Sequence, residues 1–120
     1  INWTEGEKHF RNCLLDFNKA NNVAQWQWVA GCGADAAPYF RIFNPILQGE
    51  KFDKEGKYVK KWVPELNKVP QKFIHKPWEM ETKYQEAINT IIGKNYPKPI
   101  VIHEEARTSA LKAFQSLKKK

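Results

Sequence analysis

Three side chains in the segment NNVAQWQWVAGCG, residues 21–33, have types and a spacing that suit redox chemistry and stacking: Asn22, Trp26 and Trp28. In a helix, Asn22 and Trp26 lie one turn apart and share a face. Trp26 and Trp28 project about 200° apart around the same helix. Because an indole is both an oxidisable π-system and a stacking surface for a nucleobase, the two rings would serve different neighbours. Burial in a helical core is the simpler alternative for both.

Other catalytic chemistries have no motif in the chain. There is no nucleophile elbow, no Gly-rich phosphate loop after a strand and no histidine pair at metal spacing. Structural roles are the simpler interpretation of His9, His75 and His103, and Cys13 and Cys32 are expected to be small buried side chains. The sequence therefore predicts no metal site.

The composition predicts one soluble helical domain over residues 1–120, with 42% hydrophobic residues for a core. A net charge of +7 favours polyanion partners, although lysines on a solvated surface are the alternative. No run of about 18 apolar residues spans a membrane and no signal segment opens the chain, so a cytoplasmic location is expected. Since the chain begins at Ile1 and its only methionine is Met80, we expect that a part upstream is missing.

The first half of the chain predicts two helices that hold these side chains. Thr4 and Glu7 have the spacing of a capping box, which would open a first helix. The stretch 18–22 favours a turn, and residues 23–30 then predict a second helix that Gly31 ends.

The second half predicts further helices separated by prolines. Pro38 suits the first turn of a short helix, the Asn-Pro pair after it signals a turn, and Asp53 is suited to cap a third helix over 57–62. An apolar stripe predicts a helix over 84–93, and another helix begins at about Glu104. No stretch alternates with the period of a strand, so the fold class is all-α with long loops.

Several blocks carry a resemblance to a known family. WQW, DAAPYFRIFNP, QGEKFD and WVPEL follow in this order, with KPW at residues 76–78 and YPKPIVIHEEAR at 96–107. Over nearly its whole length the chain resembles the C-terminal end of the photolyase/cryptochrome family, and within it the class I cyclobutane pyrimidine dimer DNA photolyases. The resemblance implies the C-terminal helical portion of an FAD-binding domain, with the antenna domain and the first part of the FAD domain outside this chain.

The resemblance also implies an activity. Such enzymes use blue light and a reduced FAD to pass an electron to a pyrimidine dimer flipped out of DNA, and the electron returns after the dimer splits. It implies UV-damaged DNA as the partner, a monomeric parent enzyme in the bacterial cytoplasm, and an antenna chromophore such as folate or deazaflavin bound outside this chain. These 120 residues alone are expected to be inactive.

Five residues match the flavin side of the family pattern. Asn22 matches the residue that faces the flavin N5, and Asp16 and Asn18 match the segment at the isoalloxazine edge. Trp26 and Trp3, the latter expected before the first helix, match the proximal and middle members of the tryptophan relay. Asn18 stands where aspartate is common, so flavin binding would be weaker if the side chain rather than the backbone makes the contact.

Four residues match the DNA side. Trp28 matches an indole that packs against the flipped dimer, and Arg41, Gln48 and Lys51 match positions near the DNA backbone. For Arg41, a buried salt bridge with Asp35 is an equal alternative.

Two other functions stay open at this point. One is a cryptochrome-type blue-light photoreceptor on the same fold, against which Asn22 argues because plant and insect signalling members tend to have Asp or Cys there. The other is a redox-inert basic helical module that binds DNA.

Overall fold

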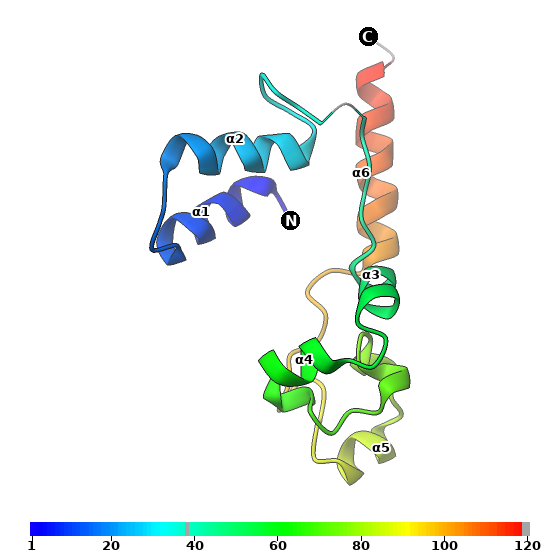
Figure 1. Ribbon diagram of the computed structural model, residues 1–120. Helices are drawn as coiled ribbons and strands as arrows, with labels where there is room; N and C mark the ends of the chain where they lie inside the picture. The colour runs from blue at the N-terminus through cyan, green and yellow to red at the C-terminus, as the bar shows by residue number, and fades with distance from the viewer. Residues whose placement is uncertain (38, 119–120) are drawn as a thin grey trace. The chain divides into compact units, whose positions relative to one another are not determined.

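The computed structural model describes residues 1–37 and 39–118, which fold into helices and short helical turns (Figure 1). Within these ranges the only β-structure is an isolated bridge between Ile92 and Tyr96, so the all-α prediction is confirmed. The chain forms two compact units, residues 1–42 and 43–120. Pro38, predicted to open a short helix, lies outside the described residues.

The elements are α1 (Trp3–Cys13), α2 (Lys19–Ala30), α3 (Pro45–Phe52), α4 (Lys57–Trp62), η1 (Pro64–Leu66), η2 (Gln71–Phe73), η3 (Pro77–Glu79), α5 (Thr82–Ala87) and α6 (His103–Lys118).

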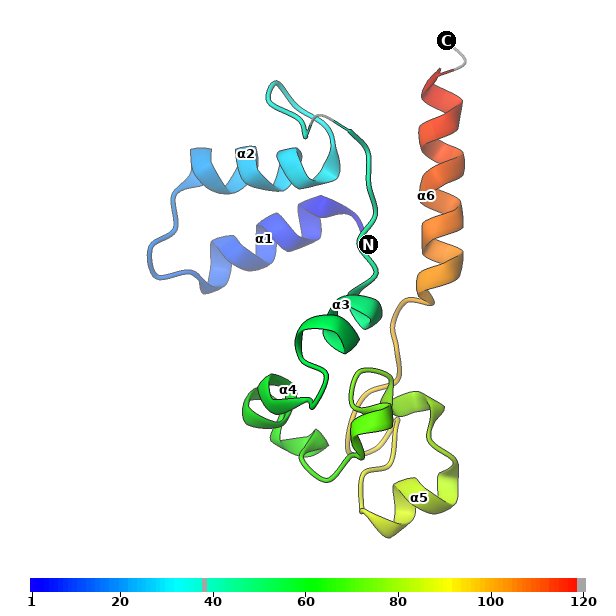
Figure 2. The same ribbon diagram turned by 45° about the vertical axis from the view of Figure 1, so that its right-hand side comes forward.

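The first unit is a hairpin of α1 and α2, which lie side by side in both views (Figures 1 and 2). Helix α1 begins at Trp3, because the side chain of Asn2 accepts a hydrogen bond from the Thr4 amide at 3.0 Å. The predicted capping box of Thr4 and Glu7 is therefore wrong, and Trp3 lies in the first turn of α1 rather than before it. Asparagine is as good an N-cap as threonine, and Asn2 comes before Thr4 in the chain, so it takes the N-cap position.

Helix α2 begins earlier than the sequence pattern predicts. Asn18 is its N-cap, and the Asn18 side chain accepts a hydrogen bond from the Asn21 amide at 3.0 Å. The predicted turn over 18–22 is thus the cap and first turn of the helix, since the asparagines that favour turns also favour N-caps. Gly31 ends α2 in the left-handed conformation at φ 70°, as predicted.

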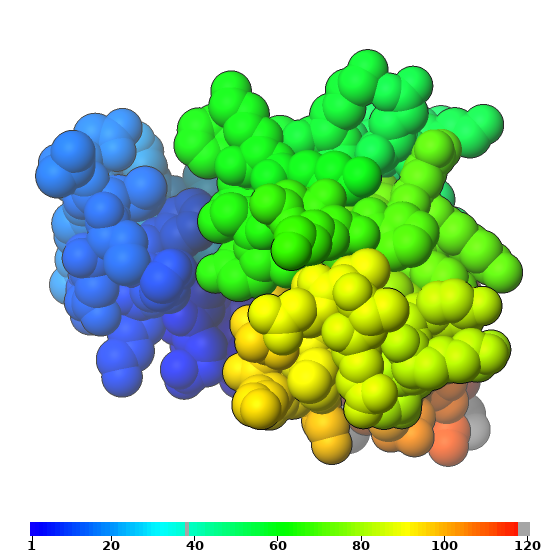
Figure 3. Space-filling model, turned by 90° about the horizontal axis from the view of Figure 1, so that it is seen from below, coloured from blue at the N-terminus to red at the C-terminus, as the bar shows by residue number. Residues whose placement is uncertain are grey.

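The second unit has a small core built by short helical turns. Its buried apolar side chains are Leu66, Val69, Ile74 and Met80. The segments coloured green to yellow that supply them pack against one another in the space-filling view (Figure 3). Gly56, at φ 68°, lies so close to Ile74 that a Cβ there would overlap it, so this turn requires glycine on two counts.

Two elements of the second unit differ from the predictions. The Asn-Pro pair begins helix α3, because the Asn44 side chain accepts from the amides of Ile46 and Leu47 and Pro45 occupies the first turn. Helix α5 ends at Ala87 and not at 93, because the buried Gln85 side chain binds the Met80 carbonyl and the Ile92 amide and holds the chain in a turn. The last helix, α6, begins at His103, close to the prediction.

Asp53 holds the start of α4, as predicted, although it stands outside the N-cap position itself. Its carboxylate accepts from the amides of Tyr58 at 3.1 Å and Val59 at 3.2 Å. Burial acts to raise the pKa of Asp53, but these amide hydrogen bonds and the nearby His75 outweigh it, and the pKa is lowered from its ordinary value of 3.8.

We expect the stability of the second unit to depend on Asp53 at low pH. Because its pKa is lower in the folded than in the unfolded state, the ionised carboxylate stabilises the fold above about pH 4, and this contribution is lost as the pH falls through the folded-state pKa. Urea unfolding between about pH 6 and about pH 2 should therefore show a steeper loss of stability for the wild type than for Asp53→Asn. Asp35→Asn, at an exposed aspartate, is the control, and parallel curves for Asp53→Asn and wild type would contradict the role of Asp53.

The two cysteines differ from the prediction of small buried side chains. Cys13 is exposed and Cys32 is half-buried. In the part of the chain that the structure describes, no helix is long and apolar enough to cross a membrane.

Candidate functional site

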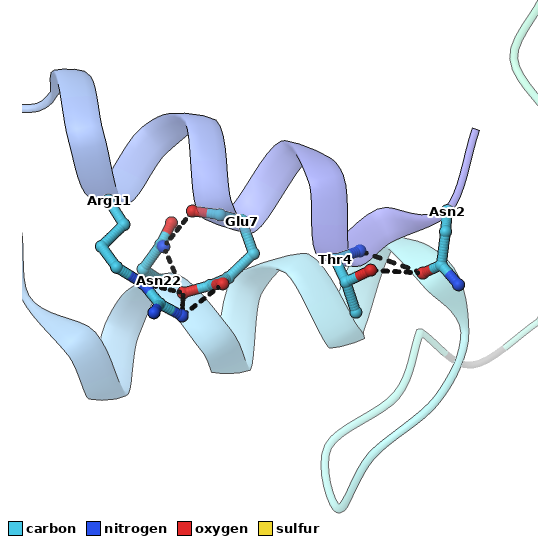
Figure 4. A network of polar contacts seen from close by, with 5 residues as sticks. All are labelled: Asn2, Thr4, Glu7, Arg11 and Asn22. Carbon is cyan, nitrogen blue, oxygen red and sulfur yellow. Dashed lines mark hydrogen bonds and ion pairs between the residues drawn. The ribbon is translucent and has the colours of Figure 1, made fainter.

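A buried polar network joins the two helices of the first unit (Figure 4). Asn22 of α2 is 8% exposed, and Glu7 of α1 is 5% exposed. The Asn22 Nδ2 group donates to the Glu7 carbonyl oxygen at 2.9 Å and to Glu7 Oε1 at 3.1 Å. Arg11, one turn further along α1, binds both carboxylate oxygens of Glu7, the shorter contact being Nη2 to Oε2 at 2.7 Å. A buried carboxylate is thus paired with a cation and with a neutral amide.

The indole of Trp26 lies over a glycine of the opposite helix. A Cβ at Gly6 would overlap atoms of the six-membered ring of Trp26, so only glycine lets the two helices approach this closely. The ring of Phe10 meets the ring of Trp26 edge to face, with centroids 5.1 Å apart and planes at 81°. Helix α1 therefore fixes the position of this indole from two neighbouring turns.

A pocket of about 340 Å³ opens beside this indole. It includes four predicted flavin-side residues, Asp16, Asn18, Asn22 and Trp26, so the structure brings together side chains from the α1–α2 loop and from the first turns of α2. Trp3 and Trp28 are not among its lining residues. The complete lining is Phe10, Leu14, Asp16, Asn18, Asn21, Asn22, Gln25 and Trp26.

The pocket suits the ring system of a flavin. It combines apolar and aromatic walls with amides and one carboxylate, which is the usual make-up of a cofactor pocket. Its volume is at the lower end of the range of about 300–1,000 Å³ for ligand sites. Asn18 Oδ1 accepts from the amide of Asn21 at 3.0 Å, and the Asn18 carbonyl accepts from the amide of Asn22 at 2.9 Å, so both of its oxygens serve the start of α2.

Several residues of the polar network and of the pocket are not identified from the sequence. Glu7 was interpreted as a capping residue and Arg11 was not interpreted at all, although their i, i+4 spacing is the signal of an ion pair on a helix. The pocket residues Asn21 and Gln25 share a face with Asn22 within one turn, which the helical start at Lys19 would have shown.

The residues predicted to contact DNA do not line this pocket. Trp28 is half-buried on α2, and its carbonyl accepts from the amides of Gly31 and Ala37. Gln48 and Lys51 lie exposed on α3 in the second unit, and Lys51 Nζ is 5.1 Å from the ring centroid of a neighbouring aromatic residue, Phe52.

Arg41 is exposed, and its guanidinium lies 5.4 Å from the ring centroid of Tyr39. Asp35 is exposed as well, so the alternative of a buried salt bridge between Arg41 and Asp35 is wrong. A metal would need at least three His, Cys, Asp or Glu side chains in one place, and residues 1–37 and 39–118 hold no such group.

Comparisons with known proteins show the family of the chain. Residues 1–116 match the family described as the FAD binding domain of DNA photolyase. The chain is 56% identical over 119 residues to a deoxyribodipyrimidine photo-lyase of Agrobacterium fabrum, and 48% identical over 119 residues to that of Escherichia coli. These alignments cover 99% of the chain, and the chain spans about a quarter of the length of both relatives (25% and 24%).

Solved structures give the same result. A bacterial class III photolyase from Agrobacterium tumefaciens superposes with a TM-score of 0.84 at 55% identity, over 100% of this chain and 25% of that one. A Synechocystis cryptochrome gives 0.82 at 34% identity, over 93% of this chain and 23% of that one. Since a class III protein is this similar, the class I assignment stays a prediction. The chain belongs to the family of photolyase FAD-binding domains.

Proposed function

We propose that the protein carrying this chain is a deoxyribodipyrimidine photo-lyase and that these residues form one wall of its flavin site. The observation that carries the proposal is the single pocket lined by Asp16, Asn18, Asn22 and Trp26. Names of relatives at 40–56% identity support the same activity.

FAD, when bound, would supply the light-driven electron that splits a pyrimidine dimer. Asn22 offers a neutral amide toward the flavin N5 without adding charge beside it. Trp26, held at the pocket wall by Gly6 and Phe10, passes electrons inward from Trp3. Asp16 and Asn18 hold the edge of the ring system.

On the DNA side, we assign Trp28 to the flipped dimer and Arg41, Gln48 and Lys51 to the phosphate backbone. The net charge of +7 supports a polyanion partner, because cations near phosphates gain from the release of counterions. Contacts of this kind position the duplex without reading its sequence.

A blue-light photoreceptor is the second candidate, favoured by the similarity to the Synechocystis cryptochrome. The two functions differ in whether pyrimidine dimers are split. A redox-inert DNA-binding module is the third, and it would bind DNA without flavin.

The test is dimer repair in blue light by the purified protein that carries this chain. We expect FAD to copurify and dimers to be lost from irradiated DNA, and Trp28→Ala to weaken binding of the damaged DNA about tenfold, because stacking on one base contributes about 1–3 kcal/mol. Trp78→Ala, at another partly exposed tryptophan, is the matched control. Flavin without repair would favour the photoreceptor, and DNA binding without flavin would favour the redox-inert module.

We also propose that the 120 residues alone hold FAD weakly, since they span about a quarter of the length of the relatives and would supply one wall of the site. Near-stoichiometric flavin absorbance in the purified 120-residue protein would contradict this.

A further inference from the structure

We propose that Glu7 is a positioning residue that fixes the amide of Asn22, so that the Asn22 Oδ1 atom is the one left for the pocket. The inference rests on the proposed function, in which Asn22 faces the flavin. It concerns a residue of α1 that does not itself line the pocket.

The first step is the hydrogen-bond inventory of Asn22. Its amide has two protons on Nδ2 and one acceptor, Oδ1. Nδ2 donates to the Glu7 carbonyl oxygen at 2.9 Å and to Glu7 Oε1 at 3.1 Å (Figure 4). Both partners are acceptors, so rotating the amide by 180° would place Oδ1 against two oxygens in a buried site. The orientation of Asn22 is therefore set by Glu7.

The second step is the charge of Glu7. At 5% exposure the carboxylate needs a partner, and Arg11 supplies it through Nη2, which lies 2.9 Å from Oε1 and 2.7 Å from Oε2. An ionised carboxylate is an acceptor only, so it never offers Asn22 a proton. Arg11 thus acts on Asn22 through Glu7, while half of its own side chain stays in solvent.

The third step is the consequence for the ligand. An amide oxygen fixed at the pocket wall favours a hydrogen-bond donor on the bound molecule. A flavin carries a proton on N5 only when it is reduced, so the arrangement selects the reduced cofactor. The buried pair of Glu7 and Asn22 would then raise the affinity of the pocket for reduced flavin relative to oxidised flavin.

The experiment uses the protein that carries this chain, with Glu7→Gln as the variant. Glutamine keeps the shape of the side chain, but one of its two polar ends is a donor, so the hydrogen bond from Asn22 to this side chain is weakened while the bond to the backbone carbonyl of residue 7 remains. NMR of the Asn22 side-chain amide should show hydrogen exchange about tenfold faster than in the wild type, since a hydrogen bond to a charged group has been weakened. Glu5→Gln, the same change at an exposed position of α1, should leave the exchange rate unchanged.

A second readout uses reduced FAD labelled with nitrogen-15 at N5. Its N5 chemical shift in Glu7→Gln should move toward the shift found in Asn22→Ala. If Glu7→Gln changes neither the exchange rate nor the N5 shift, the positioning role is overturned. If exchange accelerates while Asn22→Ala leaves N5 unmoved, Glu7 does position Asn22, and the assignment of Asn22 to the flavin fails separately.

A further variant covers the case in which Glu7→Gln does not fold. Arg11→Lys keeps the positive charge but replaces the planar guanidinium, which binds both carboxylate oxygens of Glu7, by a compact ammonium group. We expect Asn22 side-chain exchange to be faster in Arg11→Lys than in the wild type, and an unchanged rate would overturn the proposal.

Discussion

Trp26→Phe is expected to slow light-driven reduction of bound FAD by roughly a hundredfold or more, since each 1.4 kcal/mol added to a barrier costs a factor of ten. A phenyl ring is much harder to oxidise than an indole, so the hop through this position becomes uphill. The ring of Phe10 and the helix around position 26 remain, so the pocket keeps its aromatic wall. The measurement is the rate of flavin reduction during blue-light illumination with an external reductant.

Trp78→Phe makes the same chemical change at a tryptophan of η3 in the second unit that does not line the pocket, and it should leave the rate within about twofold of wild type, as expected of a surface substitution. FAD content is measured in both variants, so that a loss of binding is separated from a loss of electron transfer. Photoreduction at the wild-type rate in FAD-loaded Trp26→Phe would refute the relay through Trp26.

Gly6→Ala is expected to destabilise the first unit by about 1–2 kcal/mol, although alanine is the better helix former. On helix propensity alone the change would stabilise α1 by about 0.5–1 kcal/mol. The new Cβ would overlap the six-membered ring of Trp26, and overpacking of this kind costs about 1–3 kcal/mol. Urea unfolding gives the difference in stability.

The sign of the effect should reverse in the Trp26→Phe background. A phenyl ring does not reach the atoms Cη2 and Cζ3 that the alanine Cβ would overlap, so there Gly6→Ala should stabilise by about 0.5–1 kcal/mol. Equal effects in both backgrounds would mean that the closeness of Gly6 and Trp26 does not limit this position.

The helices that sequence patterns predicted well are those with a strong apolar period and a clear end. Gly31 marked the end of α2, and α6 began within a residue of its expected start. The predicted starts of helices were wrong where the same residue type favours both a turn and a helix N-cap. Asn18 and Asn44 both favour turns and both cap helices here, and neither composition nor spacing separates these uses.

The end of α5 could not be predicted for a different reason. The apolar stripe continues to Ile92, which favours helix, but the buried Gln85 side chain replaces helical hydrogen bonds with contacts to the Met80 carbonyl and the Ile92 amide. A polar side chain that bonds the backbone from within the core is a tertiary effect, so the local pattern does not contain it.

For the candidate site, the sequence grouped four residues that line one pocket, without showing what holds them there. That Asn22 and Trp26 share a face followed from helical periodicity, and both now line one pocket with Asp16 and Asn18. The supporting residues Gly6 and Glu7 lie on another helix, and their roles depend on how α1 packs against α2. The repeat of apolar residues within one helix does not show which residues of another helix it will contact.

The short connection between α1 and α2 has a consequence for how the protein folds. Glu7 and Asn22 are separated by only 15 positions, so their contact closes a small loop, and contacts of low sequence separation form quickly. We expect this hairpin to assemble as an early nucleus, within microseconds, ahead of partners that come from distant parts of the chain. Substitutions at the Glu7–Asn22 contact should then slow refolding more than they speed unfolding, which gives high φ-values.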